Sequence, residues 1–264
     1  MPTIHVRNAH FYYELHGQGE PLVLISGYGA DHVFWLPILA QLAQYFRVLI
    51  FDNRAIGQTK DHETFPLSAD YLADDTVALI SALGMDNPHI IGHSMGGTVL
   101  QRIAARYPKH THKIAILNSS VKWRQAMLSG LKSALSLRKQ NGIADTVVDA
   151  LIPWLFGEAF LQNPSHVELV RTSVLNNPHA QSLIDQERQF AALQQFDGRA
   201  GLSQITAPAL LIYGKEDIIS LPQESETLAA GIRGSTLHAL EGGHMSVVED
   251  TRALVSALLS FFKA

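Results

Sequence analysis

The most constraining feature of this sequence is the alternation of short apolar runs with longer segments of helical periodicity. Two of these runs are LVLI at residues 22–25 and VLIF at residues 48–51. Runs without polar alternation are typical of strands that are buried on both faces, as in parallel sheets covered by helices. Further short runs of this type occupy residues 89–91, 113–117, 209–213 and 235–240. The alternation predicts an α/β fold with a mostly parallel sheet flanked by helices.

One long stretch, residues 121–205, departs from this alternation. It has helical patterns and several Pro and Asn breaks, but no convincing strand. We expect it to form a helical cap, or lid, over the carboxyl edge of the sheet. The chain would then divide into a core of residues 1–120 and 206–264 and a cap of residues 121–205. The alternative is that it forms two extra covering helices with long loops.

Composition excludes several classes of protein. The chain has 264 residues and no cysteine, which excludes disulfides, iron–sulfur clusters, Cys-ligated zinc and a thiol nucleophile. Its net charge is −4 and it has no block of Lys or Arg, so we expect no nucleic-acid partner. No apolar run is long enough to span a membrane. Residues 1–7 lack the pattern of a signal peptide, and we therefore expect a cytoplasmic location.

The pentapeptide Gly-His-Ser-Met-Gly at residues 92–96 matches the G-x-S-x-G pattern. It follows the predicted strand 89–91 and precedes a predicted helix at residues 95–106, which is the setting of a nucleophile elbow. Such a turn strains the serine backbone, and the flanking glycines remove side chains that would collide. We therefore predict that Ser94 is a nucleophile. The alternative is a serine that only caps the helix.

A serine hydroxyl needs a base, and the base needs a carboxylate that orients it. Among the 13 histidines, His244 is distinguished by its place after the last predicted strand, behind two glycines. Asp217 lies a few residues past the strand 209–213, at the same edge of the sheet, and Glu216 is the adjacent competitor. We predict Asp217 and His244 as the partners of Ser94. A loop histidine and a turn aspartate are the alternatives.

Together these motifs resemble the α/β-hydrolase superfamily. The order Ser94, Asp217, His244 is the order of that fold. Gly-x-Ser-Met-Gly-Gly at residues 92–97 is shared by a large group within it, and the segments 26–29, 52–59, 205–217 and 241–244 also match. The sequence is similar to enol-lactonases, small carboxylesterases and cofactor-free haloperoxidases. The resemblance implies an α/β-hydrolase fold, with a mostly parallel eight-stranded sheet and a cap inserted before the last two strands.

The resemblance also implies an oxyanion hole and a substrate pocket. The backbone N–H groups of Tyr28 and Met95 would form the hole. Ser26 stands where many members have histidine, and this departure concerns the geometry of the loop at residues 26–30. Four apolar residues of the cap are candidates for the pocket wall, with the cap's own core as the alternative. These are Trp123, Trp154, Leu155 and Phe156.

These features predict a serine esterase of the carboxylic ester hydrolase class, acting on a small ester or lactone. The reaction would pass through an acyl-enzyme and need no cofactor or metal. Cleavage of a C–C bond and perhydrolysis of the haloperoxidase type use the same catalytic triad and remain alternatives. A small-molecule sensor with slow turnover is another. A small-molecule substrate is the only partner we expect, with a homodimer as an open option.

Overall fold

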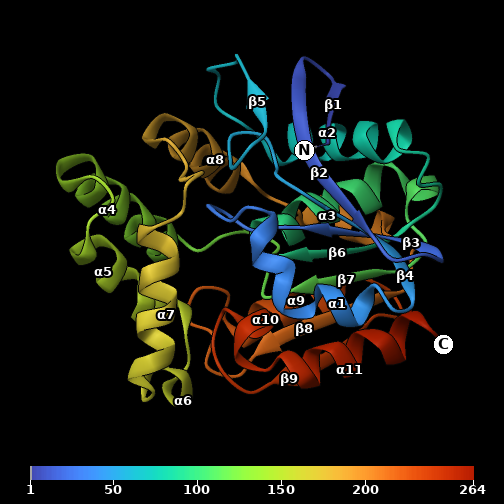
Figure 1. Cartoon of the computed structure of the whole chain (residues 1–264). Helices are drawn as coiled ribbons and strands as arrows, with labels where there is room; N and C mark the ends of the chain where they lie inside the picture. Colours follow the sequence, from blue (N-terminus) through green and yellow to red (C-terminus); the bar gives the residue numbers. More distant parts are fainter. Residues whose placement is uncertain (1) are drawn as a thin grey trace.

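The computed structural model describes residues 2–264, which are built around one sheet (Figure 1). Eight strands follow the order β1-β2-β4-β3-β6-β7-β8-β9, and a short strand, β5, pairs with β2 beside this path. The pairs from β4 to β9 along this path are parallel, whereas β2 pairs antiparallel with β1, β4 and β5. The predicted α/β fold with a mostly parallel sheet is therefore confirmed. The strands are β1 Thr3–Val6, β2 Ala9–His16, β3 Glu20–Ile25, β4 Phe46–Phe51, β5 Lys60–Asp61, β6 His89–His93, β7 Ile114–Leu117, β8 Ala209–Gly214 and β9 Thr236–Leu240.

Helices cover both faces of this sheet because its central strands are apolar on both sides. In β3, Val23 and Ile25 join one hydrophobic cluster, whereas Leu22 and Leu24 join the cluster on the opposite face. Helices α2 (Ala69–Ala82), α3 (Met95–Arg106) and α9 (Pro222–Gly231) contribute to the first cluster. Helices α1 (Leu36–Leu42) and α11 (Thr251–Phe262) contribute to the second. This packing fixes the strand ends that carry the predicted site.

A helical insert, residues 121–205, lies between β7 and β8. Figure 1 shows α4, α5 and α7 grouped at one side of the sheet. Phe190 and Leu193 of α8 join the main core, whereas α5 has a small apolar cluster that includes Val148 and Ile152. The division of the chain at residues 121 and 205 stays a prediction. The helices of the insert are α4 Gln125–Asn141, α5 Asp145–Leu155, α6 Glu158–Leu161, α7 Pro164–Leu175, α8 Leu183–Gln195 and the 3-10 helix η3 Arg199–Gln204.

The carboxyl-terminal helix differs from the sequence prediction. The apolar pattern of residues 246–262 predicts one helix, but α10 (Ser246–Glu249) and α11 are separate. The break falls at Asp250, whose φ of −133° and ψ of 55° are not helical. Its carboxylate accepts a hydrogen bond from the Ala253 N–H (3.3 Å) and so caps α11. Among residues 2–264, no helix is both long and apolar enough to cross a membrane.

Candidate active site

Ser94 lies at the sharp turn between β6 and α3. Its φ is +54° and its ψ is −118°, a conformation that L residues rarely adopt and that costs about 1–3 kcal/mol. The Ser94 N–H donates to the Leu117 carbonyl of β7 (2.9 Å), which ties the turn to the neighbouring strand. The turn therefore lifts the serine hydroxyl at the carboxyl end of β6 without leaving its amide unpaired.

The glycines on either side of Ser94 are required by close backbone contacts. A Cβ at Gly92 would lie 2.4 Å from the carbonyl oxygen of Gly96. A Cβ at Gly96 would lie 2.0 Å from the carbonyl oxygen of Ile25 in β3. Both distances are well inside van der Waals contact, so any side chain here would push the elbow away from the sheet.

The structure brings Ser94, His244 and Asp217 together, although they come from three separate loops. The Ser94 Oγ lies 2.9 Å from Nε2 of His244, and Nδ1 of His244 lies 2.8 Å from Oδ2 of Asp217. A carboxylate only accepts hydrogen bonds, so the proton of the neutral imidazole sits on Nδ1 and the Nε2 lone pair faces the hydroxyl. The three residues are 8%, 3% and 1% exposed, respectively. This arrangement can move a proton from serine to histidine.

Asp217 occupies a pocket of hydrogen-bond donors. Its Oδ1 accepts from the N–H groups of Ile219 and Ser220 (2.9 Å each), and its Oδ2 accepts from Nδ2 of Asn118 (3.0 Å). Burial alone would raise the pKa of Asp217, but His244 and these donors hold the pKa below its usual range. Asn118 was not predicted as part of the site. The signal for it is its place directly after β7, at the edge where the other strand ends converge.

Glu216, the competing acid, points elsewhere. Its carboxylate accepts a hydrogen bond from the backbone N–H of Glu158, at the start of α6 (2.8 Å). Of the two candidate acids, Asp217 is therefore the one that pairs with His244.

His93, directly before the nucleophile, contacts the loop that carries His244. Its Nε2–H donates to the backbone carbonyl of His244 (2.9 Å), and the two rings lie 5.1 Å apart. Complete burial lowers the pKa of His93 to about 3, so its ring is neutral. Its role was not predicted, because it occupies a variable position of the G-x-S-x-G pattern and its contact with the His244 loop appears only in the folded chain.

The insert also holds the loop of His244. The Leu155 carbonyl at the end of α5 accepts from the N–H groups of His244 (2.9 Å) and Met245 (3.2 Å). The Glu249 carboxylate accepts from the N–H groups of Gly157 (2.7 Å) and Gly243 (3.0 Å). These hydrogen bonds join residues 155–157 of the insert to residues 243–249, next to His244.

The two N–H groups predicted for the oxyanion hole are free. Met95 is the first residue of α3, where N–H groups have no partner within the helix and carry partial positive charge. Tyr28 lies in the loop after β3. In the part of the chain that the structure describes, neither N–H donates a hydrogen bond. The loop itself is shaped by Ser26, whose Oγ donates to the Asp31 carbonyl (3.1 Å).

The four predicted pocket residues do not form one cluster. Trp123 is buried and its Nε1–H donates to Oγ1 of Thr98 on α3 (3.2 Å). Trp154 is 40% exposed, and Phe156 is buried in the small cluster of α5. Leu155 contributes its carbonyl to the His244 loop. A pocket lined by these four side chains stays a prediction.

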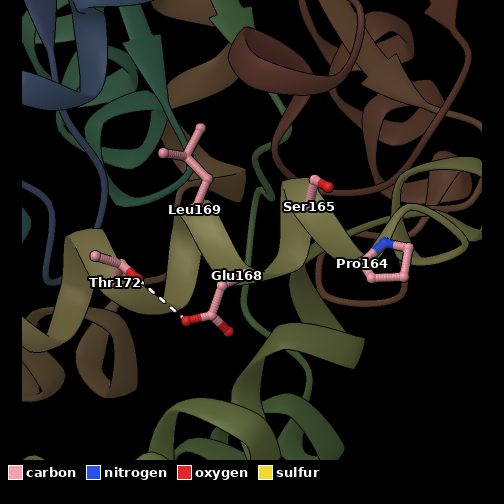
Figure 2. A pocket seen from close by; sticks show the side chains of 5 residues that line it. All are labelled: Pro164, Ser165, Glu168, Leu169 and Thr172. Atoms are coloured by element: carbon pink, nitrogen blue, oxygen red, sulfur yellow. Dashed lines mark hydrogen bonds between the residues drawn. The ribbon is translucent and has the colours of Figure 1, made fainter.

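A separate depression of about 500 Å³ lies along α7. Figure 2 shows the side chains that line it. It contains no residue of the Ser–His–Asp arrangement, and the Glu168 carboxylate within it accepts from Oγ1 of Thr172 (3.3 Å). It is lined by Pro164, Ser165, Glu168, Leu169 and Thr172. Over residues 2–264, no three His, Asp or Glu side chains are grouped so as to hold a metal ion.

Comparison with known proteins adds independent evidence about the chain. The model of the alpha/beta hydrolase fold family matches residues 20–251. A relative from Stutzerimonas stutzeri, provisionally named carbamate hydrolase RutD, is 33% identical over 94% of this chain and 95% of its own. A 3-oxoadipate enol-lactonase from Acinetobacter baylyi is 25% identical over 92% of this chain and 88% of its own.

Solved structures share the same fold over the whole length. The enol-lactonase from Burkholderia xenovorans LB400 has a TM-score of 0.89 and 22% identity, and the match covers 100% of both chains. An esterase from Thermogutta terrifontis has a TM-score of 0.87 and 20% identity over 100% of this chain and 98% of that chain. At these identities the similarity shows the fold alone.

Proposed function

Because the chain belongs to the alpha/beta hydrolase fold family, we propose that it hydrolyses a small carboxylic ester or lactone through a covalent acyl-serine intermediate. The observation that carries this proposal is the continuous hydrogen-bonded path from Asp217 through His244 to Ser94. These residues would form a catalytic triad, whose order along the chain is that of the fold.

Acylation would begin with attack of the Ser94 Oγ on the substrate carbonyl carbon while Nε2 of His244 takes the hydroxyl proton. The tetrahedral oxyanion would accept hydrogen bonds from the N–H groups of Tyr28 and Met95, which stabilise charge that develops only in the transition state. Collapse of this intermediate would break the bond to the alkoxide, which leaves with the proton from His244. The acyl group would remain on Ser94.

Deacylation would repeat these steps with water as the nucleophile. His244 would take a proton from the water, which attacks the acyl carbon, and would return that proton to Ser94 as the ester bond breaks. Asp217 would hold the imidazole in the required tautomer throughout. With a lactone, the leaving alkoxide belongs to the same molecule as the acyl group, so a single hydroxy acid would be released.

A second candidate function is hydrolysis of a carbamate. It is favoured by the name carbamate hydrolase, which relatives at 28% and 33% identity carry. A carbamate carbonyl is the weaker electrophile, because its nitrogen donates electron density to it. The same triad would therefore acylate more slowly on a carbamate than on an ester with the same leaving group.

The test combines active-site labelling with a substrate panel. The purified protein should be labelled by a fluorophosphonate at Ser94, as located by mass spectrometry, and should hydrolyse members of a panel of nitrophenyl esters, lactones and carbamates. Ser94→Ala should remain unlabelled and lose activity by several orders of magnitude. Labelling of Ser94→Ala, or no turnover of any carbonyl substrate by the wild type, would contradict the proposal. Turnover far below the typical range of about 1–10³ s⁻¹ on every substrate would instead favour a sensor.

A further inference from the structure

We propose that Gln189, on α8 of the insert, is a positioning residue for the oxyanion hole. It would hold the loop at residues 26–30 so that the Tyr28 N–H faces the oxygen that becomes negative. This inference rests on the proposed function, because it assigns Gln189 a part in the same reaction.

The side-chain amide of Gln189 is fully buried and both of its ends are paired. Its Oε1 accepts from the Gly29 N–H (3.1 Å), and its Nε2 donates to the carbonyl of Arg54 (3.0 Å). The Gly29 N–H and the Tyr28 carbonyl belong to one rigid peptide plane. The bond to Gln189 therefore fixes the orientation of that plane, next to the Tyr28 N–H.

The neighbours of Gln189 on α8 keep it in place. Arg188 is 4% exposed and forms an ion pair with Asp61 of β5 (3.1 Å). The ring of Phe190 meets the ring of Tyr28 edge-on, with 6.5 Å between centroids. Gln189 and Phe190 thus contact the loop at residues 26–30, while Arg188 ties the same helix to β5 of the core.

Packing alone does not explain an amide at this position. An apolar residue of the same size could fill the space, but it would leave the Gly29 N–H and the Arg54 carbonyl without this partner. The amide also orients the loop. Its Oε1 fixes the direction of the Gly29 N–H, and the hydrogen bond from its Nε2 to the Arg54 carbonyl holds the Gln189 side chain in one rotamer. An oxyanion donor is effective when it is held rigidly before the charge develops. The effect of Gln189 should therefore be larger in the transition state than in the bound substrate.

The main variant is Gln189→Met, which keeps the approximate volume and removes both hydrogen bonds. We expect kcat to fall about 10-fold or more, a smaller loss than the roughly 10²–10³ for complete removal of an oxyanion donor. KM should be unchanged, and affinity for a boronic acid that mimics the tetrahedral intermediate should fall in step with kcat.

Leu193→Ala is the matched control, since Leu193 lies on the same helix, is buried and has no contact of this kind. It should lower Tm and leave kcat unchanged at temperatures well below Tm. A Gln189→Met enzyme with wild-type kcat, or one whose KM rises with no loss of kcat, would overturn the proposal.

Amide hydrogen exchange at Gly29 separates this inference from the proposed function. In the wild type the Gly29 N–H should be protected, and in Gln189→Met it should exchange faster while the amides of α8 do not. A wild type that neither hydrolyses carbonyl substrates nor is labelled at Ser94 would refute the proposed function, and with it any positioning role. Active, labelled wild type with equal Gly29 exchange in both proteins would refute the role of Gln189 alone.

Discussion

At the scale of single residues, the two adjacent carboxylates Asp217 and Glu216 give a sharp test of the site. Asp217→Asn should fold normally but lower kcat by about 10⁴, as in the serine-protease template, because the amide favours the wrong tautomer of His244. Glu216→Gln is the matched control and should keep most of the activity, since Glu216 pairs with the Glu158 N–H. Steady-state kinetics of both variants provide the measurement. A larger loss for Glu216→Gln than for Asp217→Asn would reverse the assignment.

His93 gives a second prediction at this scale, which concerns stability and pH. Its pKa is about 3 in the folded protein, against about 6.5 in an unfolded chain. Between these pH values the unfolded state binds one more proton than the folded state. The contribution of His93 to the free energy of unfolding is therefore complete above about pH 6.5 and is lost as the pH falls towards 3. Within that range the free energy of unfolding falls by up to about 1.4 kcal/mol per pH unit because of this one group.

His93→Gln isolates this contribution, because glutamine can still donate to the His244 carbonyl but does not titrate. Urea unfolding at pH 7, 6 and 5 should show a steeper loss of unfolding free energy in the wild type than in the variant. Parallel curves for the two proteins would mean that His93 is accessible to protons in the folded state.

The same scale shows which site residues the sequence could predict. Ser94, Asp217 and His244 follow predicted strands and carry glycine-rich or acidic motifs, so local pattern and chain order together predict their proximity. Asn118 also follows a predicted strand, but its role, like that of Gln189, depends on side-chain hydrogen bonds to residues far away in the sequence, which no local motif indicates. Their contacts emerge only when the sheet and the insert are assembled.

At the scale of elements, the insert packs closely against the loop that carries His244. A Cβ at Gly157 would lie 2.8 Å from the Cα of Gly242 and 3.0 Å from the nitrogen of Gly243. Gly157→Ala should therefore displace the loop of His244 and lower kcat, with a shift of about 1 Å sufficient for a loss near 10²-fold.

Gly201→Ala provides the control for this variant. Gly201 lies in η3, at the other end of the insert, and a Cβ there would meet the Cβ of Ala105 at 3.5 Å and Nη1 of Arg102 at 3.9 Å, which are ordinary contacts. Its kcat and Tm should match those of the wild type. Equal kinetics for Gly157→Ala would show that the loop accommodates the methyl group without moving His244.

Strands with continuous apolar runs can be predicted from the sequence, whereas helices with a weak apolar pattern cannot. The runs in β3, β4, β6, β7 and β8 are apolar on both faces, and each appears as a strand. Helix α9 buries only Ser225 and Leu228, so its apolar face is too narrow to give a clear signal. The break at Asp250 depends on a capping bond that leaves the apolar pattern on both sides intact.

At the scale of the whole molecule, we expect part of the structure to open when substrate enters the candidate site. Ser94 and His244 are only 8% and 3% exposed, so little of either residue lies at the surface. The sheet is held by two large clusters, one on each face, whereas α5 has three buried apolar residues and α7 has none. Opening the insert around α5 to α7 would therefore expose fewer buried apolar side chains than opening the sheet.

Native-state hydrogen exchange in low concentrations of urea tests this uneven stability. Segments with few buried contacts open locally at low free energy, whereas core strands exchange only through global unfolding. We expect the amides of α7 to exchange early and with little dependence on urea, and those of β3 and β6 to follow the global transition. A phosphonate bound to Ser94 should slow exchange in α7 if opening of the insert admits the substrate. Protection of α7 equal to that of β6, with the same urea dependence, would mean that the insert opens only when the whole chain unfolds, so that substrate must enter by another path.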